Sequence, residues 1–140
     1  MKYSLGLIVF LLIAIQFIPS KVINPKTPKN LEIKAPKEVM AIFRKSCYDC
    51  HSNQTNIPWY ASVAPASFFI KRHVDIGRRW VNFSIWNSYT PKEKDKKLGE
   101  IYKSIYHAMP LPNYLKMHKG AKLTKQQIEL IQKWTGKIPY

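Results

Sequence analysis

The chain has 140 residues, of which 46% are hydrophobic and 13% aromatic. This length fits one domain with a modest core and excludes an array of large domains. The formal net charge is +15, from 23 Lys and Arg against 8 Asp and Glu. This charge favours an acidic partner protein or an anionic membrane surface. We do not expect nucleic acid as a partner, because the N-terminus indicates an exported chain.

Residues 1–20 predict a signal peptide or an N-terminal membrane anchor. A short positively charged start precedes residues 5–18, where only Gly6 and Gln16 interrupt the apolar sequence. The stretch is short for a spanning helix, but no small-x-small cleavage site follows it, which favours a retained anchor. We therefore expect the chain on the periplasmic side, anchored through residues 4–19 or released after cleavage.

The rest of the chain predicts an all-α domain. Prolines and lysines in residues 21–35 favour an extended linker, and residues 36–140 follow as the folded domain. Apolar spacing, capping signals and proline or glycine stops predict about four helices with long loops, and no strand alternation is present. These helices are expected from residue 36 into the Cys47 segment, over 66–79, from Thr90 to about 107, and from Thr124 to Gly136.

Both cysteines lie in the stretch Cys47-Tyr48-Asp49-Cys50-His51. Thiol–disulfide exchange uses such a pair, but within a fold that alternates strands and helices. Structural zinc needs four ligands, and no second pair of ligands accompanies the cysteines. Covalent haem attachment uses both thiols and also requires the adjacent histidine, which becomes the proximal iron ligand. The pattern therefore favours one covalently attached haem c, with zinc and redox thiols as alternatives.

A second axial ligand is expected from Met109. It lies between the third helix and Pro110, in a segment that two prolines hold out of helix. A thioether on a stiff loop suits iron ligation, whereas a methionine in a helical stripe usually fills a core. The other candidates are Met117, His73, His107 and His118, of which His118 is the strongest rival.

Several large side chains are candidates for the surroundings of the haem. Trp59 and Trp86 are expected in its apolar wall or in the core. Arg78 and Trp86 are also candidates to bind the propionates, since arginine recognises carboxylates well. A solvent-exposed helix end is an equally good explanation of Arg78.

The chain resembles the haem-binding domain family, which consists of small exported or anchored bacterial proteins related to c-type cytochromes. The resemblance covers nearly all of residues 36–136. It is carried by Cys47–His51, called here the haem-attachment stretch, and by five further motifs. These are Pro58-Trp59-Tyr60, His73-Val74-x-x-Gly77-Arg78, Asn82-Phe83-Ser84-x-Trp86, Met109-Pro110-Leu111-x-x-Tyr114 and His118-x-x-Ala121-x-Leu123-Thr124. It implies a cytochrome c-like domain with thioether bonds at Cys47 and Cys50, His51 as the proximal ligand and Met109 as the distal one. It also adds Tyr114 to the expected cofactor-binding residues.

One-electron transfer is the function that these features favour. A haem with histidine and methionine ligands leaves no open position for a substrate, so we expect an electron carrier rather than an enzyme. The basic surface would guide an acidic redox partner. A displaceable distal ligand would instead allow sensing or catalysis with a diatomic gas or peroxide. A zinc-stabilised binding module is the second alternative.

Overall fold

The computed structural model describes residues 2–138, which form seven α-helices and five short 3-10 helices without a strand. The all-α prediction is therefore confirmed. The α-helices are α1 (Lys2–Ala14), α2 (Lys37–Ser46), α3 (Tyr48–His51), α4 (Ala66–Trp80), α5 (Pro91–His107), α6 (Pro112–Met117) and α7 (Lys125–Thr135). The 3-10 helices are η1 (Ile15–Phe17), η2 (Lys29–Leu31), η3 (Trp59–Ser62), η4 (Phe83–Ser88) and η5 (Lys119–Ala121).

Two helices begin and end as the capping signals predict. Thr90 accepts a hydrogen bond from the backbone of Glu93, which reciprocates, and Pro91 occupies the first turn of α5. Thr124 and Gln127 form the same capping box at α7. Gly136 ends α7 with a φ of 64°, a left-handed conformation that glycine adopts without strain. These local signals determine where α5 and α7 begin and end, and the two helices pack against each other.

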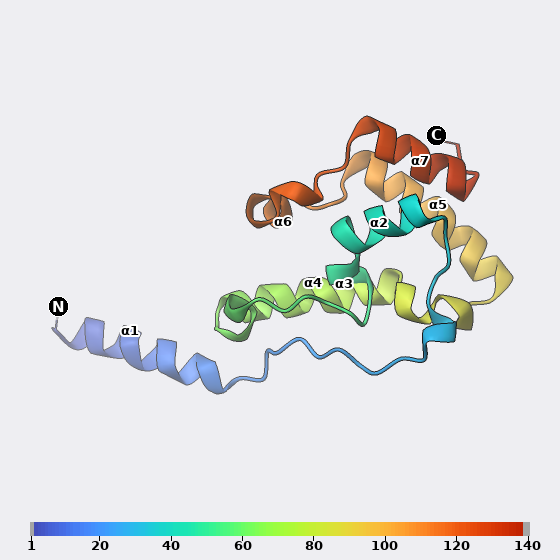
Figure 1. Cartoon of the computed structure of the whole chain (residues 1–140). Coiled ribbons are helices and arrows are strands. Elements are labelled where there is room, and N and C mark those ends of the chain that lie inside the picture. Colours follow the sequence, from blue (N-terminus) through green and yellow to red (C-terminus); the bar gives the residue numbers. More distant parts are fainter. Residues whose placement is uncertain (1, 139–140) are drawn as a thin grey trace.

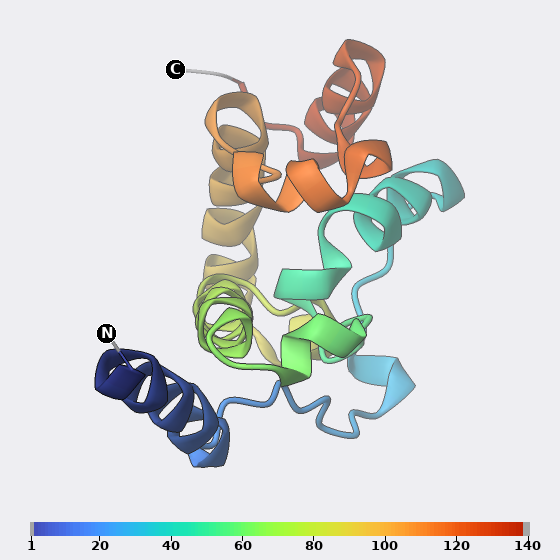
Figure 2. The ribbon, with the colours of Figure 1, turned by 90° about the vertical axis from the view of Figure 1, so that its left-hand side faces the viewer.

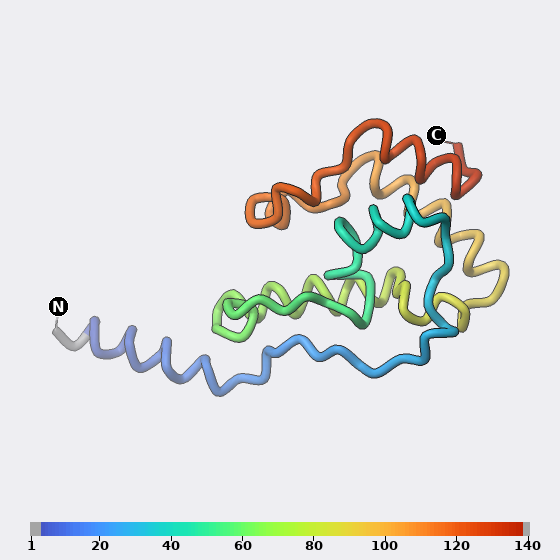
Figure 3. The backbone as a smooth tube through the Cα atoms, viewed as in Figure 1, coloured from blue at the N-terminus to red at the C-terminus, as the bar shows by residue number. Residues whose placement is uncertain are grey.

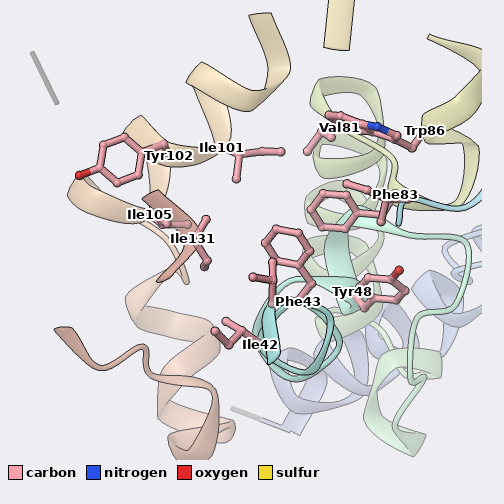
Figure 4. Close-up of a cluster of buried hydrophobic side chains, with 12 residues drawn as sticks. Ile42, Phe43, Tyr48, Val81, Phe83, Trp86, Ile101, Tyr102, Ile105 and Ile131 are labelled. Atoms are coloured by element: carbon pink, nitrogen blue, oxygen red, sulfur yellow. The ribbon is translucent and has the colours of Figure 1, made fainter. Parts of the chain in front are cut away.

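One core lies between α2, α5, α7 and η4. Figure 4 shows Phe43 of α2 beside Phe83 of η4, and their stacked rings are 4.9 Å apart between centroids. Ile101 and Ile105 reach this core from α5, and Ile131 reaches it from α7. Burying these large side chains supplies most of the free energy that offsets the lost chain entropy. The core thereby holds α7 against both α5 and α2, and α2 leads directly into the Cys47 segment.

The segment expected as a linker is extended, but it also packs against the domain. Figure 3 traces it along the side of α4 that faces away from α6. Ile33 is only 2% exposed and belongs to the core, while Val22 is also buried. The backbone amide of Ile33 donates to the Phe83 carbonyl over 2.9 Å. Residues 21–35 therefore form an integral part of the domain surface, not a free tether.

Helix α1 extends away from the other helices (Figure 1). Its side chains from Leu5 to Ile13 are apolar and almost all exposed, with no polar face. Contact with the domain begins at Gln16, whose amide group donates to the Ala64 carbonyl (3.1 Å) and accepts from the Ala64 amide (3.0 Å). Within residues 2–138, no helix is both long and apolar enough to cross a membrane.

Candidate functional site

The Cys47–His51 stretch forms a sharp corner between two helices. Cys47 is the C-cap of α2 and the N-cap of α3, so the two cysteines and His51 lie within a single turn and a half of helix. Ser52, fully buried, ends α3 by donating to the Tyr48 carbonyl over 2.8 Å. The corner lays α3, and with it both cysteines and His51, beside α4, and Figure 2 shows these two helices from the end of α4.

The imidazole of His51 is fixed by two backbone carbonyls. Its Nδ1 lies 3.0 Å from the Gly77 oxygen and 3.2 Å from the Val81 oxygen, at the C-terminal end of α4. A carbonyl can only accept, so Nδ1 carries the hydrogen and Nε2 keeps its lone pair. Burial lowers the pKa of His51, which keeps the ring neutral. A neutral histidine with one nitrogen held by a carbonyl is the usual form of a metal ligand.

Gly77 allows the closest approach between α3 and α4. A Cβ atom at this position would overlap the carbonyl oxygen of Cys50 and lie 3.0 Å from its carbonyl carbon. A residue other than glycine would therefore push α3 away from α4, and with it His51 from the carbonyls that hold its ring. The positions of Gly77 and His51 thus both depend on the close packing of α3 against α4.

Both cysteines are partly buried, free thiols. Burial raises the pKa of Cys47 to about 12, and the neighbouring Cys50 adds to the rise. Burial, followed by the charge of Asp49, raises the pKa of Cys50 to about 11. Thiol–disulfide exchange requires thiolates at neutral pH, so these values argue against a redox dithiol. Residues 2–138 contain no group of three or more His, Cys, Asp or Glu that could hold a metal ion.

Met109 follows α5 directly and is partly buried against the core. Ala108 caps α5, and the backbone amide of Met109 donates to the Ser104 carbonyl over 2.8 Å. The following residues form α6, which lies above α3 and α4 in Figure 1. The other methionine candidate, Met117, is 68% exposed at the end of α6, while His73 and His107 are exposed too.

Tyr114 and His118 belong to the same end of the molecule. The Tyr114 hydroxyl donates to the Asp49 carboxylate over 2.7 Å, so α6 is tied to the Cys47–His51 stretch. Burial and this hydrogen bond raise the pKa of Tyr114. The ring of His118 stacks on that of Tyr114 with 4.1 Å between the centroids, and its Nδ1 lies 3.1 Å from the Tyr114 carbonyl oxygen.

Arg78 connects the segment before α2 to the loop after α3. Its Nε donates to the Ser52 carbonyl (2.8 Å), and its Nη1 donates to the Ile23 carbonyl (2.6 Å). Its Nη2 donates to the side chains of Asn24 (2.8 Å) and Thr55 (3.0 Å). These partners give Arg78 a structural role that the sequence did not indicate, beside the propionate contact expected for it.

The tryptophans lie in contrasting surroundings. Trp86 is 8% exposed in the core, where its ring meets Tyr89 edge-on at 5.9 Å. Trp59, in η3, is 80% exposed. Of the apolar residues of α4, Val74 is buried, whereas Phe69 and Trp80 are 65% and 63% exposed. Phe69, Ile76 and Trp80 recur at helical spacing along another face of α4, a signal that could have been recognised from the sequence.

These residues fit a haem group. Two free thiols, a neutral histidine with an available Nε2, a partly buried methionine and exposed apolar side chains on α4 together form a donor set and an apolar surface that haem requires. No curated protein and no solved structure matches the chain. The family model described as a haem-binding domain matches residues 10–137, and so most of the described fold. The chain belongs to the haem-binding domain family, and haem is its cofactor.

Proposed function

We propose that the protein carries one covalently attached haem c and transfers single electrons. The observation that carries this proposal is the orientation of His51. Its Nδ1 is occupied by the Gly77 and Val81 carbonyls, so Nε2 is left to ligate iron as the proximal ligand. The two free thiols lie on the same turn of helix, at the spacing that haem attachment uses.

Each thiol would add across one vinyl group of the haem. The sulfur bonds to one vinyl carbon and the thiol hydrogen goes to the other, so no further reactant is consumed. The addition requires reduced thiols, and Cys47 and Cys50 are both free, with raised pKa values. The same values disfavour the rival use of the pair in disulfide exchange.

We propose Met109 as the distal ligand. Of the two candidate methionines, Met109 lies partly buried against the core, while Met117 is exposed. Haem iron supplies the one-electron chemistry, and a methionine ligand raises its potential relative to a second histidine. The chain's part is to hold both axial side chains in place and to surround the haem with apolar groups. Exposed Phe69 and Trp80 on α4, together with Trp59, are the residues proposed for that wall.

The partner that we propose is an acidic redox protein. The net charge of +15 would attract such a partner over long distances and raise the rate of encounter. The apolar, exposed side chains of α1 support the expectation that the chain is exported and anchored, or released after cleavage. Haem attachment on the exported side is compatible with both outcomes.

The test of covalent attachment uses a host that exports the chain and matures c-type cytochromes. Wild-type protein should retain haem after acid–acetone extraction and give the pyridine haemochrome α-band of two saturated vinyl groups. Cys47→Ser with Cys50→Ser should release its haem to the solvent. Each single variant serves as a matched control and should show the α-band of one saturated vinyl group. Extraction of haem from the wild type would overturn the covalent assignment.

The test of electron transfer is the spin state of the iron. Low-spin spectra, a weak near-infrared sulfur-to-iron band and slow carbon monoxide binding support a closed histidine–methionine site. High-spin iron that binds carbon monoxide at once would instead support gas or peroxide chemistry.

A further inference from the structure

A single hydrogen bond joins the haem-attachment stretch to the segment that follows Met109. The Tyr114 hydroxyl on α6 donates to the Oδ2 atom of Asp49 on α3 over 2.7 Å, and the contact is partly buried. Asp49 stands between the two cysteines, and Tyr114 stands five residues after Met109. The bond therefore connects the two sides from which the iron would be ligated.

Asp49 is itself held rigidly. Its other carboxylate oxygen, Oδ1, accepts from the backbone amide of Asn56 over 3.0 Å. Its backbone carbonyl accepts from the Thr55 hydroxyl over 2.8 Å. Both carboxylate oxygens are thus engaged, so the acceptor that Tyr114 meets has a fixed position.

The Tyr114 ring also packs against a residue at the end of its own helix, α6. The His118 ring stacks on it at 4.1 Å with an angle of 10° between the planes. Rotation of the Tyr114 side chain away from Asp49 would therefore also break this stacking. A hydrogen bond to a charged acceptor with a stacked donor ring is among the stronger polar contacts that a protein makes.

The Met109 segment is thereby fixed at both of its ends. Before it, Ile105 anchors α5 in the core, and the Met109 amide donates to the Ser104 carbonyl. After it, the bond from Tyr114 anchors α6 to α3. We propose that the Asp49–Tyr114 hydrogen bond is a latch that keeps the Met109 thioether on the iron, with Tyr114 as a positioning residue. This inference rests on the proposed function, in which Met109 is the distal ligand.

The latch predicts how fast the distal position opens. Carbon monoxide can bind a ferrous histidine–methionine haem only after the methionine leaves, so its binding rate at high concentration reports that step. The experiment uses the full-length haem-loaded chain and stopped-flow mixing with carbon monoxide. Tyr114→Phe should raise the limiting rate about tenfold, because it removes a hydrogen bond to a charged group. Tyr106→Phe, at an exposed tyrosine of α5, is the matched control and should keep the wild-type rate.

A second variant guards against a failure of Tyr114→Phe to fold. Asp49→Ala removes the acceptor and should raise the same rate by a similar factor. The double variant should be no faster than either single one, since both remove the same bond. Independent, multiplying effects would overturn the latch.

The outcomes separate the latch from the proposed function. Met109→Ala is measured alongside, and it should bind carbon monoxide without delay. If Met109→Ala behaves as the wild type, Met109 is not the ligand and both proposals fail. If Met109→Ala opens the site but Tyr114→Phe keeps the wild-type rate, the latch alone fails. A lower melting temperature of Tyr114→Phe with an unchanged rate would also overturn the latch, because the bond would then be merely structural.

Discussion

His51 and Met109, the two proposed iron ligands, are held in place by different means. His51 lies in a helix that touches α4 through backbone atoms, with its ring between the Gly77 and Val81 carbonyls. Met109 lies in a loop, and its position depends on the docking of α5 in the core and on the bond from Tyr114 to Asp49. The proximal side is thus fixed by the main chain and the distal side by side chains.

This difference predicts which substitutions the site can accommodate without a change of fold. Backbone contacts at closest approach cannot relax without moving a helix, so changes at Gly77 should affect the whole site. Side-chain contacts can be exchanged one at a time, so changes near Met109 should alter the ligand and leave the fold intact. Substitutions on the two sides can therefore test whether His51 and Met109 are held in place in different ways.

The largest effect is expected for Gly77→Ala. The new methyl group would overlap the Cys50 carbonyl, and the strain should destabilise the domain by about 3 kcal/mol. Displacement of α3 should also lower the yield of haem-loaded protein. Urea unfolding and the pyridine haemochrome assay measure the two consequences.

Gly99→Ala provides the matched control for that substitution. A Cβ atom at Gly99 of α5 meets nothing within 4 Å, so alanine should stabilise the helix by up to about 1 kcal/mol. Equal changes in the free energy of unfolding for Gly77→Ala and Gly99→Ala would contradict the close backbone packing of α3 against α4.

A smaller effect on stability, but a large one on the spectrum, is expected for Met109→Ala. Loss of a partly buried side chain should cost about 1–2 kcal/mol. The haem should remain attached, and the iron should become high-spin because its distal ligand is gone. Met117→Ala, at the exposed end of α6, should leave both the spectrum and the stability unchanged. An unaltered spectrum in Met109→Ala would exclude this residue as the ligand.

The smallest effect concerns the start of α5, the helix that precedes Met109. Hydrogen bonds from Thr90 lower the pKa of Glu93 from its ordinary value of 4.5. The folded state therefore prefers the ionised carboxylate, so this stabilisation is present above pH 4.5 and is lost as the pH falls below it. Glu93→Gln should melt slightly earlier than the wild type at neutral pH, and the gap should close in acid.

Much of the fold can be predicted because its signals are local. Thr90 and Thr124 each place a capping box at a helix start, and Gly136 supplies the left-handed residue that ends α7. The Cys-x-x-Cys-His spacing likewise lies within five residues, and the proximal site predicted from it stays a prediction. In each case the residues that define the element lie close together in the sequence.

The remaining features depend on contacts that no local pattern encodes. The partners of Arg78 are 23 to 55 residues away, so its role in holding residues 23–24 was not predictable. Helix α6 is only six residues long and begins at Pro112, two residues after Pro110, and this proline spacing alone suggests a loop. The burial of Ile33 in the core was missed because its neighbours are prolines and lysines.

The sequence separation of the contacts also determines the order in which the site assembles. The bond from Tyr114 to Asp49 closes a loop of 65 residues, whereas the contact of His51 with Gly77 closes one of 26. The longer loop costs about 0.8 kcal/mol more in chain entropy, so on average the proximal contact forms first. A chain that folds in this order presents its two thiols and its histidine on a finished helix pair while α6 is still undocked. Under the proposed covalent attachment, that partly folded state would leave the thiols accessible to haem before the bond from Tyr114 to Asp49 forms.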